Sequence, residues 1–407
     1  MNRNTDFIPF ARPDIGRGEE EAVLRVLRSG WLTTASEAKS FEEEFARYVG
    51  SPYALAVNSA TAGLHLALEA LGTGPGDRVI TSPYTFTATA GVIRHLGADP
   101  LFVDIAPGTF HIDPQGIENA IARENGGKAG EKAREKGTIR AILPIHVGGE
   151  VWGMPEIAGL SREYGIPVVE DSAHAFPSRT AGGFAGTLGG IGVYSFYATK
   201  TITTGEGGMV VTRNQEAAKR MDMMRLHGID REVWNRYTEK GASWRYAVME
   251  AGFKYNMTDI AAALGRVQLG RAGEFLEKRK EIAARYRRAF AERDYLIPPR
   301  DAEGHAWHLF LLRIDGEKLS ISRDDFIDKL QEAGIGTSVH FIPLHLHPYY
   351  GNRYGFKAED FPAAYAAYQQ VISLPIYPAM REDQVRRVID AVIRTGDSAR
   401  GAGRHRQ

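Results

Sequence analysis

The sequence contains no cysteine, and this absence excludes several kinds of chemistry. A disulfide scaffold, a thiolate nucleophile and a cysteine-bound metal all depend on that side chain. An excess of charge of one sign is lacking too, because 50 lysine and arginine residues balance 50 aspartate and glutamate residues. A chain without net charge has no global field that attracts nucleic acid or an anionic membrane. An anionic ligand must therefore be bound by a local site.

Long apolar runs are also missing. No stretch approaches the roughly 18 apolar residues that a membrane-spanning helix needs. Residues 1–28 are interrupted by prolines and charges and lack the apolar core of a signal peptide. We therefore expect a cytoplasmic protein. Its 407 residues, of which 43% are hydrophobic, are enough for two domains with ample cores.

Short apolar segments alternate with helical patterns along most of the chain. The strands that we expect from them are 53–57, 78–82, 100–103, 139–143, 167–169, 191–194 and 209–211. Apolar strands without polar alternation are buried on both faces, which favours a mostly parallel sheet flanked by helices. The predicted fold class is therefore α/β.

The pattern changes in the last quarter of the chain. It indicates a strand over 308–314, a helix over 323–333, a strand over 336–341 and then helices to about residue 394. Such a succession predicts a second, smaller α/β domain.

We place the large domain, with an N-terminal arm, at residues 1–275 and the small domain at 276–395. Residues 396–407 are basic and rich in glycine, so we expect a disordered tail. The charged run 123–137 is interpreted as a solvated insertion.

Lys200 lies between two predicted strands, in a segment of hydroxyl-bearing and small residues. An unpaired ammonium is costly to bury. A buried site therefore lowers the pKa of a lysine, and the free amine can form a Schiff base. An exposed turn accommodates a lysine equally well, so this segment alone does not decide between the two interpretations.

Two polar segments follow other predicted strands. Ser59 and Thr61 stand between a strand and a helix, where free amides and the helix dipole form an anion site. Ordinary helix capping explains the same residues. Asp171 and His174 follow a strand at the sheet edge where open α/β sheets bind ligands. A capping carboxylate and a core histidine are the alternative there.

Two further motifs suggest ligands less directly. The glycine-rich run 182–190 lacks both common phosphate-binding patterns and precedes a strand, so we interpret it as a flexible turn. His340, His345 and His347 suggest zinc, but the nearby sequence offers no supporting carboxylate or further imidazole. We expect no metal at these histidines, and instead an active-site wall that contacts a polar substrate.

Several longer motifs occur in a fixed order. They are GWLTT (30–34), NSATAGLHLAL (58–68), SPYTFTAT (82–89), VVEDSAHA (168–175), SFYATKTITTGEGG (195–208), RLHG (225–228), FKYNMTDIAAALG (253–265) and PLHLHPYY (343–350). Together they resemble the DegT/DnrJ/StrS family of sugar aminotransferases, which are pyridoxal-phosphate enzymes of fold type I. The likeness extends from about Pro9 to Arg394, nearly the whole chain.

The resemblance implies a role for each residue around the cofactor ring. Lys200 would form the Schiff base with pyridoxal 5'-phosphate and then move a proton between substrate and cofactor. Asp171 would pair with the pyridine nitrogen and keep it protonated. Phe86 would stack on the ring, and His174 would lie near the ring hydroxyl.

The resemblance also implies a phosphate site and a dimer. The amides of Ala60 and Thr61, with Ser195, would hold the cofactor phosphate at a helix N-terminus. Asn256 would reach the phosphate of the neighbouring subunit. We therefore expect a homodimer with shared active sites.

The implied reaction moves the amino group of L-glutamate to a nucleotide-linked keto-sugar in surface-polysaccharide or lipid biosynthesis. A UDP-linked 4-keto-sugar resembles the family's substrates best, and a 3-keto-sugar is the alternative. His345, Tyr349 and Arg245 are the expected substrate contacts. A pyridoxal-phosphate sugar dehydratase and a non-catalytic sensor remain open, although Lys200 favours amino transfer because the family's dehydratases carry histidine there.

Overall fold

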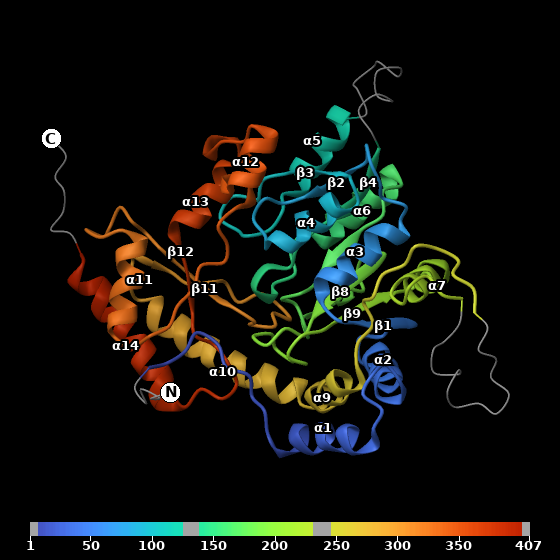
Figure 1. The fold of residues 1–407 in the computed structure, drawn as a ribbon. Helices are drawn as coiled ribbons and strands as arrows, with labels where there is room; N and C mark the ends of the chain where they lie inside the picture. The colour runs from blue at the N-terminus through green and yellow to red at the C-terminus, as the bar shows by residue number, and fades with distance from the viewer. Residues whose placement is uncertain (1–6, 125–137, 231–245, 401–407) are drawn as a thin grey trace.

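A mostly parallel sheet forms the centre of the computed structural model, which describes residues 7–124, 138–230 and 246–400 (Figure 1). Its strands are β1 (Tyr53–Val57), β2 (Arg78–Thr81), β3 (Asp99–Phe102), β4 (Ile139–Leu143), β5 (Val169–Asp171), β8 (Ile191–Ser195) and β9 (Gly208–Thr212). Parallel bridges link the β4 and β5 segments, so the order is β1-β9-β8-β5-β4-β2-β3. Among these strands β9 alone runs in the direction opposite to all the others. The predicted α/β class and mostly parallel sheet are confirmed.

Both faces of this sheet are buried, as its apolar strands predict. Side chains alternate along β4, so Ala141 and Leu143 enter one hydrophobic cluster and Ile142 enters another. The first cluster is covered by α3 (Ala60–Ala70), α4 (Thr87–His95) and α7 (Gln215–Met224). The second is covered by α5 (Pro114–Glu124) and α6 (Met154–Tyr164).

One glycine allows α3 to lie close to the sheet. A Cβ atom at Gly63 would lie 2.7 Å from a methyl group of Val193 and 2.9 Å from one of Val210. These separations are shorter than van der Waals contact, so a larger residue would push the helix away. Gly63 therefore sets the position of the helix N-terminus over the carboxyl end of β1.

Three more helices pack beside the central sheet, at the bottom of Figure 1. They are α1 (Arg17–Ser29), α2 (Ser36–Val49) and α9 (Asp259–Gly270). The carboxylate of Asp259 accepts hydrogen bonds from the backbone N–H groups of Ala35, Glu37 and Ala38. This side chain therefore ties the start of α2 to the start of α9.

A smaller antiparallel sheet with its own helices forms the C-terminal part of the chain, orange to red in Figure 1. Its strands are β10 (Leu296–Ile297), β11 (Phe310–Ile314) and β12 (Val371–Leu374). The helices are α10 (Ala272–Phe290), α11 (Arg323–Glu332), α12 (Pro348–Tyr354), α13 (Pro362–Gln370) and α14 (Glu382–Ser398). The described residues also form 3₁₀ turns η2 (Val147–Gly149), η3 (Leu344–Leu346) and η4 (Ala358–Asp360).

Two sequence predictions for this part are wrong. The segment 336–341 is not a strand, and only an isolated bridge joins its Ser338 to Ser373. The region predicted as helices contains β12, which pairs with β11 in the register Leu312–Ile372. A short apolar run fits a strand or a buried helix segment equally well, and the partner strand decides between them.

Helix α10 crosses the predicted domain boundary at residues 275 and 276. Phe275 packs beside the central sheet, whereas Tyr286 and Phe290 pack in the C-terminal core. The N-terminal arm also reaches that core, because Ile8 is buried in it and pairs with Ile335. The division at 275 stays a prediction.

The chain end is more ordered than its composition predicts. Helix α14 continues to Ser398, and the ring of Tyr295 packs so close to Gly396 that no Cβ atom would fit. The predicted tail is therefore wrong for 396–400, and residues 401–407 lie outside the described residues. Most of the predicted insertion, 125–137, also lies outside them. Of the described helices, none is both long and apolar enough to cross a membrane.

Candidate active site

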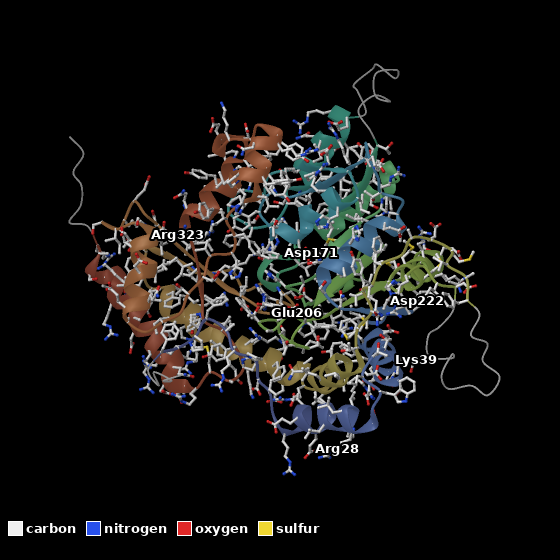
Figure 2. The ribbon with its side chains drawn as sticks, in the orientation of Figure 1. Arg28, Lys39, Asp171, Glu206, Asp222 and Arg323 are labelled. Carbon is white, nitrogen blue, oxygen red and sulfur yellow. The ribbon has the colours of Figure 1, made fainter. Side chains whose placement is uncertain are left out.

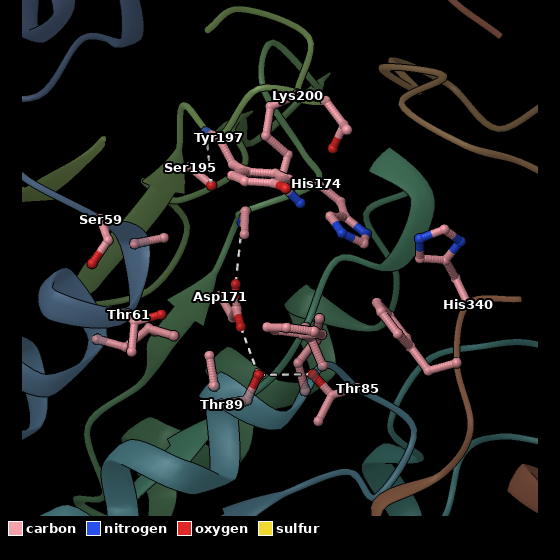
Figure 3. A pocket seen from close by; sticks show the side chains of 18 of the residues that line it. Ser59, Thr61, Thr85, Thr89, Asp171, His174, Ser195, Tyr197, Lys200 and His340 are labelled. Carbon is pink, nitrogen blue, oxygen red and sulfur yellow. Dashed lines mark hydrogen bonds between the residues drawn. The ribbon is translucent and has the colours of Figure 1, made fainter. Parts of the chain in front are cut away.

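A cavity of about 440 Å³ lies at the carboxyl ends of the central strands. Parallel strands end at the same edge of a sheet, which is where α/β proteins bind ligands. The cavity is lined by Lys200, Asp171, His174, Ala60, Thr61, Phe86 and Ser195, all of which the sequence predicts as site residues. Figure 2 places Asp171 near the middle of the molecule, and Figure 3 shows the lining side chains.

Lys200 lies in the turn that follows β8, and its side chain lines the cavity. Burial lowers the pKa of Lys200 to about 8, and the negative charge of Asp171 acts in the opposite direction. A site that excludes water disfavours the ammonium form, so the neutral amine is accessible near physiological pH. The interpretation of Lys200 as an exposed turn lysine is wrong.

Asp171 ends β5 and is 5% exposed. Its Oδ2 accepts a hydrogen bond from the Thr89 hydroxyl at 2.8 Å, and Thr89 and Thr85 share a further hydrogen bond of 2.7 Å (Figure 3). Its Oδ1 accepts one from the Ala173 N–H at 3.2 Å. Burial raises the pKa of Asp171, whereas these hydrogen bonds and the nearby Lys200 favour the carboxylate. The result is a carboxyl group that is held in one position and faces the cavity.

The N-terminus of α3 supplies the anion site. Ser59 caps the helix, because its Oγ accepts the Ala62 N–H at 3.1 Å. The first amides of a helix have no acceptor within the helix, so those of Ala60 and Thr61 are available to a ligand. Gly208 permits this approach, since a Cβ atom there would lie 2.7 Å from the Ala60 nitrogen.

His174 is held in one tautomer. Its Nδ1 accepts the Gly148 N–H at 3.3 Å, so in the neutral ring Nε2 carries the proton and can donate to a ligand. Burial lowers the pKa of His174 well below its ordinary value, which keeps the ring neutral. The rings of His308 and His340 lie 4.6 Å and 6.2 Å from it.

Phe86 follows β2 and keeps 59% of its surface exposed, although the residue is apolar. Its ring forms part of the cavity wall and lies 6.4 Å from the ring of Phe341. An exposed aromatic face inside a cavity is suited to stack on a flat ligand ring.

The other residues that the sequence predicts for the site, where the structure describes them, do not line this cavity. His345 is 1% exposed and packs against the ring of Phe361, so its assignment as a substrate contact is wrong. Tyr349 is exposed but does not line the cavity. Asn256 also lies outside the lining and donates a hydrogen bond of 2.5 Å to Thr34. Arg245 lies outside the described residues.

Sequence reasoning missed several cavity residues, among them Thr85, Thr89, Tyr197 and Glu206. The threonines follow a predicted strand within the motif SPYTFTAT, so their position at the sheet edge could have identified them. His340 reaches the cavity from the C-terminal part of the chain, and its Nδ1 lies 2.8 Å from the Ser373 hydroxyl. The sequence predicted His340 as part of an active-site wall, and the tertiary fold places it opposite the central sheet.

The glycine-rich run 182–190 is not simply a flexible turn. It contains β7 (Gly183–Phe184), which pairs with β6 (Arg179–Thr180). The N–H groups of Gly186, Leu188 and Gly189 donate to the fully buried carboxylate of Glu170, which also contacts His146 at 2.8 Å. The run therefore clamps the residue next to Asp171.

The cavity residues fit pyridoxal phosphate. The amides of α3 match a phosphate, the Phe86 ring and Asp171 match a pyridine ring with a protonated nitrogen, and Lys200 offers an amine to an aldehyde. The tautomer of His174 presents a donor to a ring oxygen. Each part of the cofactor thus meets a group of suitable chemistry.

Comparison with known proteins agrees with this assignment. The chain matches the DegT/DnrJ/EryC1/StrS aminotransferase family over residues 13–393. An uncharacterized protein of Methanocaldococcus jannaschii is 46% identical over 388 residues, which cover 95% of this chain and 97% of that protein. The spore coat polysaccharide biosynthesis protein SpsC of Bacillus subtilis is 43% identical over 395 residues, with 96% and 98% covered.

A solved structure supports the same family assignment. Spr1654, a candidate sugar aminotransferase from Streptococcus pneumoniae, matches in its PMP form with a TM-score of 0.86 and 32% identity, covering 96% of this chain and 99% of that one. Its PLP form matches with a TM-score of 0.85 and 33% identity. Pyridoxal phosphate is therefore the cofactor of this site. The chain belongs to the DegT/DnrJ/EryC1/StrS aminotransferase family and is a sugar aminotransferase.

Proposed function

We propose that this aminotransferase moves the amino group of L-glutamate to the ketone of a nucleotide-linked sugar, with a UDP-linked 4-keto-sugar as the preferred acceptor. The observation that carries the proposal is the partly buried amine of Lys200 beside the fixed carboxylate of Asp171. Amino transfer needs a base that can take up and return a proton near neutral pH, and a pKa of about 8 meets this need.

The residues around the cavity have different roles in the proposed reaction. When bound, pyridoxal phosphate supplies an aldehyde that accepts amino groups and a ring that accepts electrons. Lys200 takes a proton from one substrate carbon and returns it at another position. Asp171 keeps the proton on the ring nitrogen, and Thr89 keeps Asp171 in place. The Nε2–H of His174 would donate to an oxygen on the ring, because Nδ1 already accepts the Gly148 N–H.

The choice of substrates rests on similarity and on the motifs of the sequence. SpsC takes part, by its name, in the biosynthesis of spore coat polysaccharide, a pathway in which a sugar amine is a suitable product. The motifs FKYNMTDI and VHFIPLHLHPYY are similar to those of enzymes that aminate position 4 of UDP-linked keto-sugars. Glutamate as donor follows from the same resemblance.

The donor is tested in a half-reaction. Holoenzyme mixed with ¹⁵N-labelled glutamate alone should lose its aldehyde absorbance and release one 2-oxoglutarate per site. Alanine and aspartate are the matched donors. Release of their keto acids as fast as, or faster than, that of 2-oxoglutarate would contradict the donor assignment.

The acceptor is tested separately with UDP-, GDP- and dTDP-linked 4-keto- and 3-keto-sugars, with the products identified by mass. A ¹⁵N-labelled 4-amino UDP-sugar is the expected product. A product labelled at position 3 would show that the enzyme aminates carbon 3 and would contradict the proposed 4-keto acceptor. A sugar that has lost water without gaining nitrogen would identify a dehydratase.

We also propose that the active enzyme is a homodimer with shared sites. In support of this, Asn256 lies outside the cavity of its own chain and bonds to Thr34. Lys200→Ala and Asn256→Ala proteins should each lose activity, and mixing them after mild denaturation should restore part of it. Mixtures that stay inactive although both proteins form dimers would contradict shared sites.

A further inference from the structure

A second cavity, of about 210 Å³, lies between the central sheet and the C-terminal sheet. Phe110 and Val147 line it from the central part, and Leu311 and Arg313 line it from β11. Its walls combine apolar and ionisable side chains, and it contains none of the residues that line the active-site cavity.

Arg313 carries a positive charge that no carboxylate in this cavity neutralises. In the part of the chain that the structure describes, no hydrogen bond or ion pair to a carboxylate is made by its guanidinium, which lies over the ring of Phe110 at 5.9 Å from the ring centroid. Burial lowers the pKa of Arg313, as expected for a cation that no anion compensates. A partly buried guanidinium with five donors is a strong site for a carboxylate or a phosphate.

The other ionisable groups of the cavity balance one another. Burial of Glu150 acts against its charged form, but hydrogen bonds from His111 and Arg300 lower its pKa to about 2, so this carboxylate is already paired. Burial lowers the pKa of His305 to about 4, so its ring is neutral at pH 7. The net charge that faces the cavity is therefore that of Arg313.

We propose that this cavity binds a small organic anion, with the acidic group on Arg313 and an apolar body against Phe110, Val147 and Leu311. The volume sets the size of the ligand. It exceeds the roughly 150 Å³ of a cavity that admits benzene, and it is smaller than the roughly 300 Å³ at which pockets for drug-sized ligands begin. A nucleotide sugar does not fit, so the ligand is not the proposed substrate.

This anion site contacts the active site through one short segment. Val147 lines the anion site, and the next residue, Gly148, donates its N–H to His174. From the other wall, the Leu309 N–H donates to the Gly148 carbonyl at 3.1 Å, and a Cβ atom at Gly148 would lie 3.3 Å from Leu311. An occupant would thus touch both segments that hold the hydrogen bond to His174, and its binding should alter the cofactor spectrum.

Binding is tested by calorimetry on the holoenzyme, because bound cofactor then fills the phosphate site of α3. Benzoate and phenyl phosphate serve as probes, and the one that binds more tightly identifies the acidic group. Arg313→Gln should weaken binding about tenfold or more, which corresponds to the loss of a charge-assisted pair. Arg288→Gln, at an exposed position of α10, is the matched control and should bind like the wild type.

A second measurement locates the ligand without a variant. Crystals of wild-type holoenzyme soaked with 4-bromobenzoate should show anomalous bromine signal between Phe110 and Leu311. The proposal is overturned if neither probe binds, if Arg313→Gln and Arg288→Gln bind equally, or if bromine occupies only the active-site cavity. The crystal result decides the matter if Arg313→Gln does not fold.

Discussion

The ionisation of Lys200 offers the sharpest test of the site. Burial lowers the pKa of this amine to about 8, from an ordinary value near 10.5. At pH 7.5 about a quarter of the molecules then carry a neutral amine, against about one in a thousand for an ordinary lysine. The cavity therefore raises the supply of reactive amine by roughly two hundredfold.

Asp171→Asn perturbs this equilibrium in a defined direction. The carboxylate raises the pKa of Lys200, so its removal should lower that pKa further. At pH 7.5 the neutral fraction can then increase by at most about fourfold, from about a quarter to nearly all of the amine. Lys200 should thus become more reactive in the apoenzyme, while turnover of the holoenzyme falls because the ring nitrogen has lost its partner.

Competitive acetylation measures this fraction directly. Apoenzyme treated with trace acetic anhydride between pH 6 and pH 11, then digested, reports the labelling of each lysine by mass. The exposed Lys219, with 64% of its side chain accessible, is the internal reference. Labelling of Lys200 should reach half of its maximum near pH 8, and at lower pH in Asp171→Asn. A midpoint equal to that of Lys219, or a shift to higher pH in Asp171→Asn, would refute the reasoning.

Two further predictions concern the supports of the site. Gly208→Ala should release the cofactor at least about tenfold faster on dialysis, because its Cβ atom would press on the Ala60 nitrogen; Gly273→Ala, where a Cβ atom meets nothing within 4 Å, should retain it like the wild type. Glu170→Gln places an amide NH₂ against buried N–H donors and should destabilise the apoenzyme by about 1–3 kcal/mol. Thermal unfolding measures this effect. An unfolding temperature equal to that of the exposed control Glu332→Gln would contradict the stabilising role of the hydrogen bonds to Glu170.

Much of the cofactor site could be predicted because its residues follow strands. A position directly after a buried strand is a local property, and parallel strands bring such positions to one edge. Asp171 and Ser195 reach the cavity for this reason. The N-terminus of α3 is local in the same sense, since Ser59 caps it as the sequence indicates.

The sequence predictions that the structure contradicts concern features that depend on contacts between distant segments. His345 belongs to a polar motif, yet Phe361 and the loop around it bury the ring away from the cavity. His340, five residues earlier and expected in the same active-site wall, does line the cavity. The strand at Val371–Leu374 could not be distinguished from a helix segment until β11 was present as its partner. Gly396 is typical of a tail by composition, but close packing with Tyr295 keeps it in a helix.

The sequence by itself determined the fold class, the order of its strands and helices, and the lysine and aspartate on which the chemistry depends. These features follow from local periodicity and from motifs that lie within single segments. The tertiary structure alone decided the low pKa of Lys200, the tautomer of His174 and the uncompensated charge of Arg313. Each of these depends on which groups from remote parts of the chain exclude water or supply a partner, and burial of that kind is a property of the packed molecule.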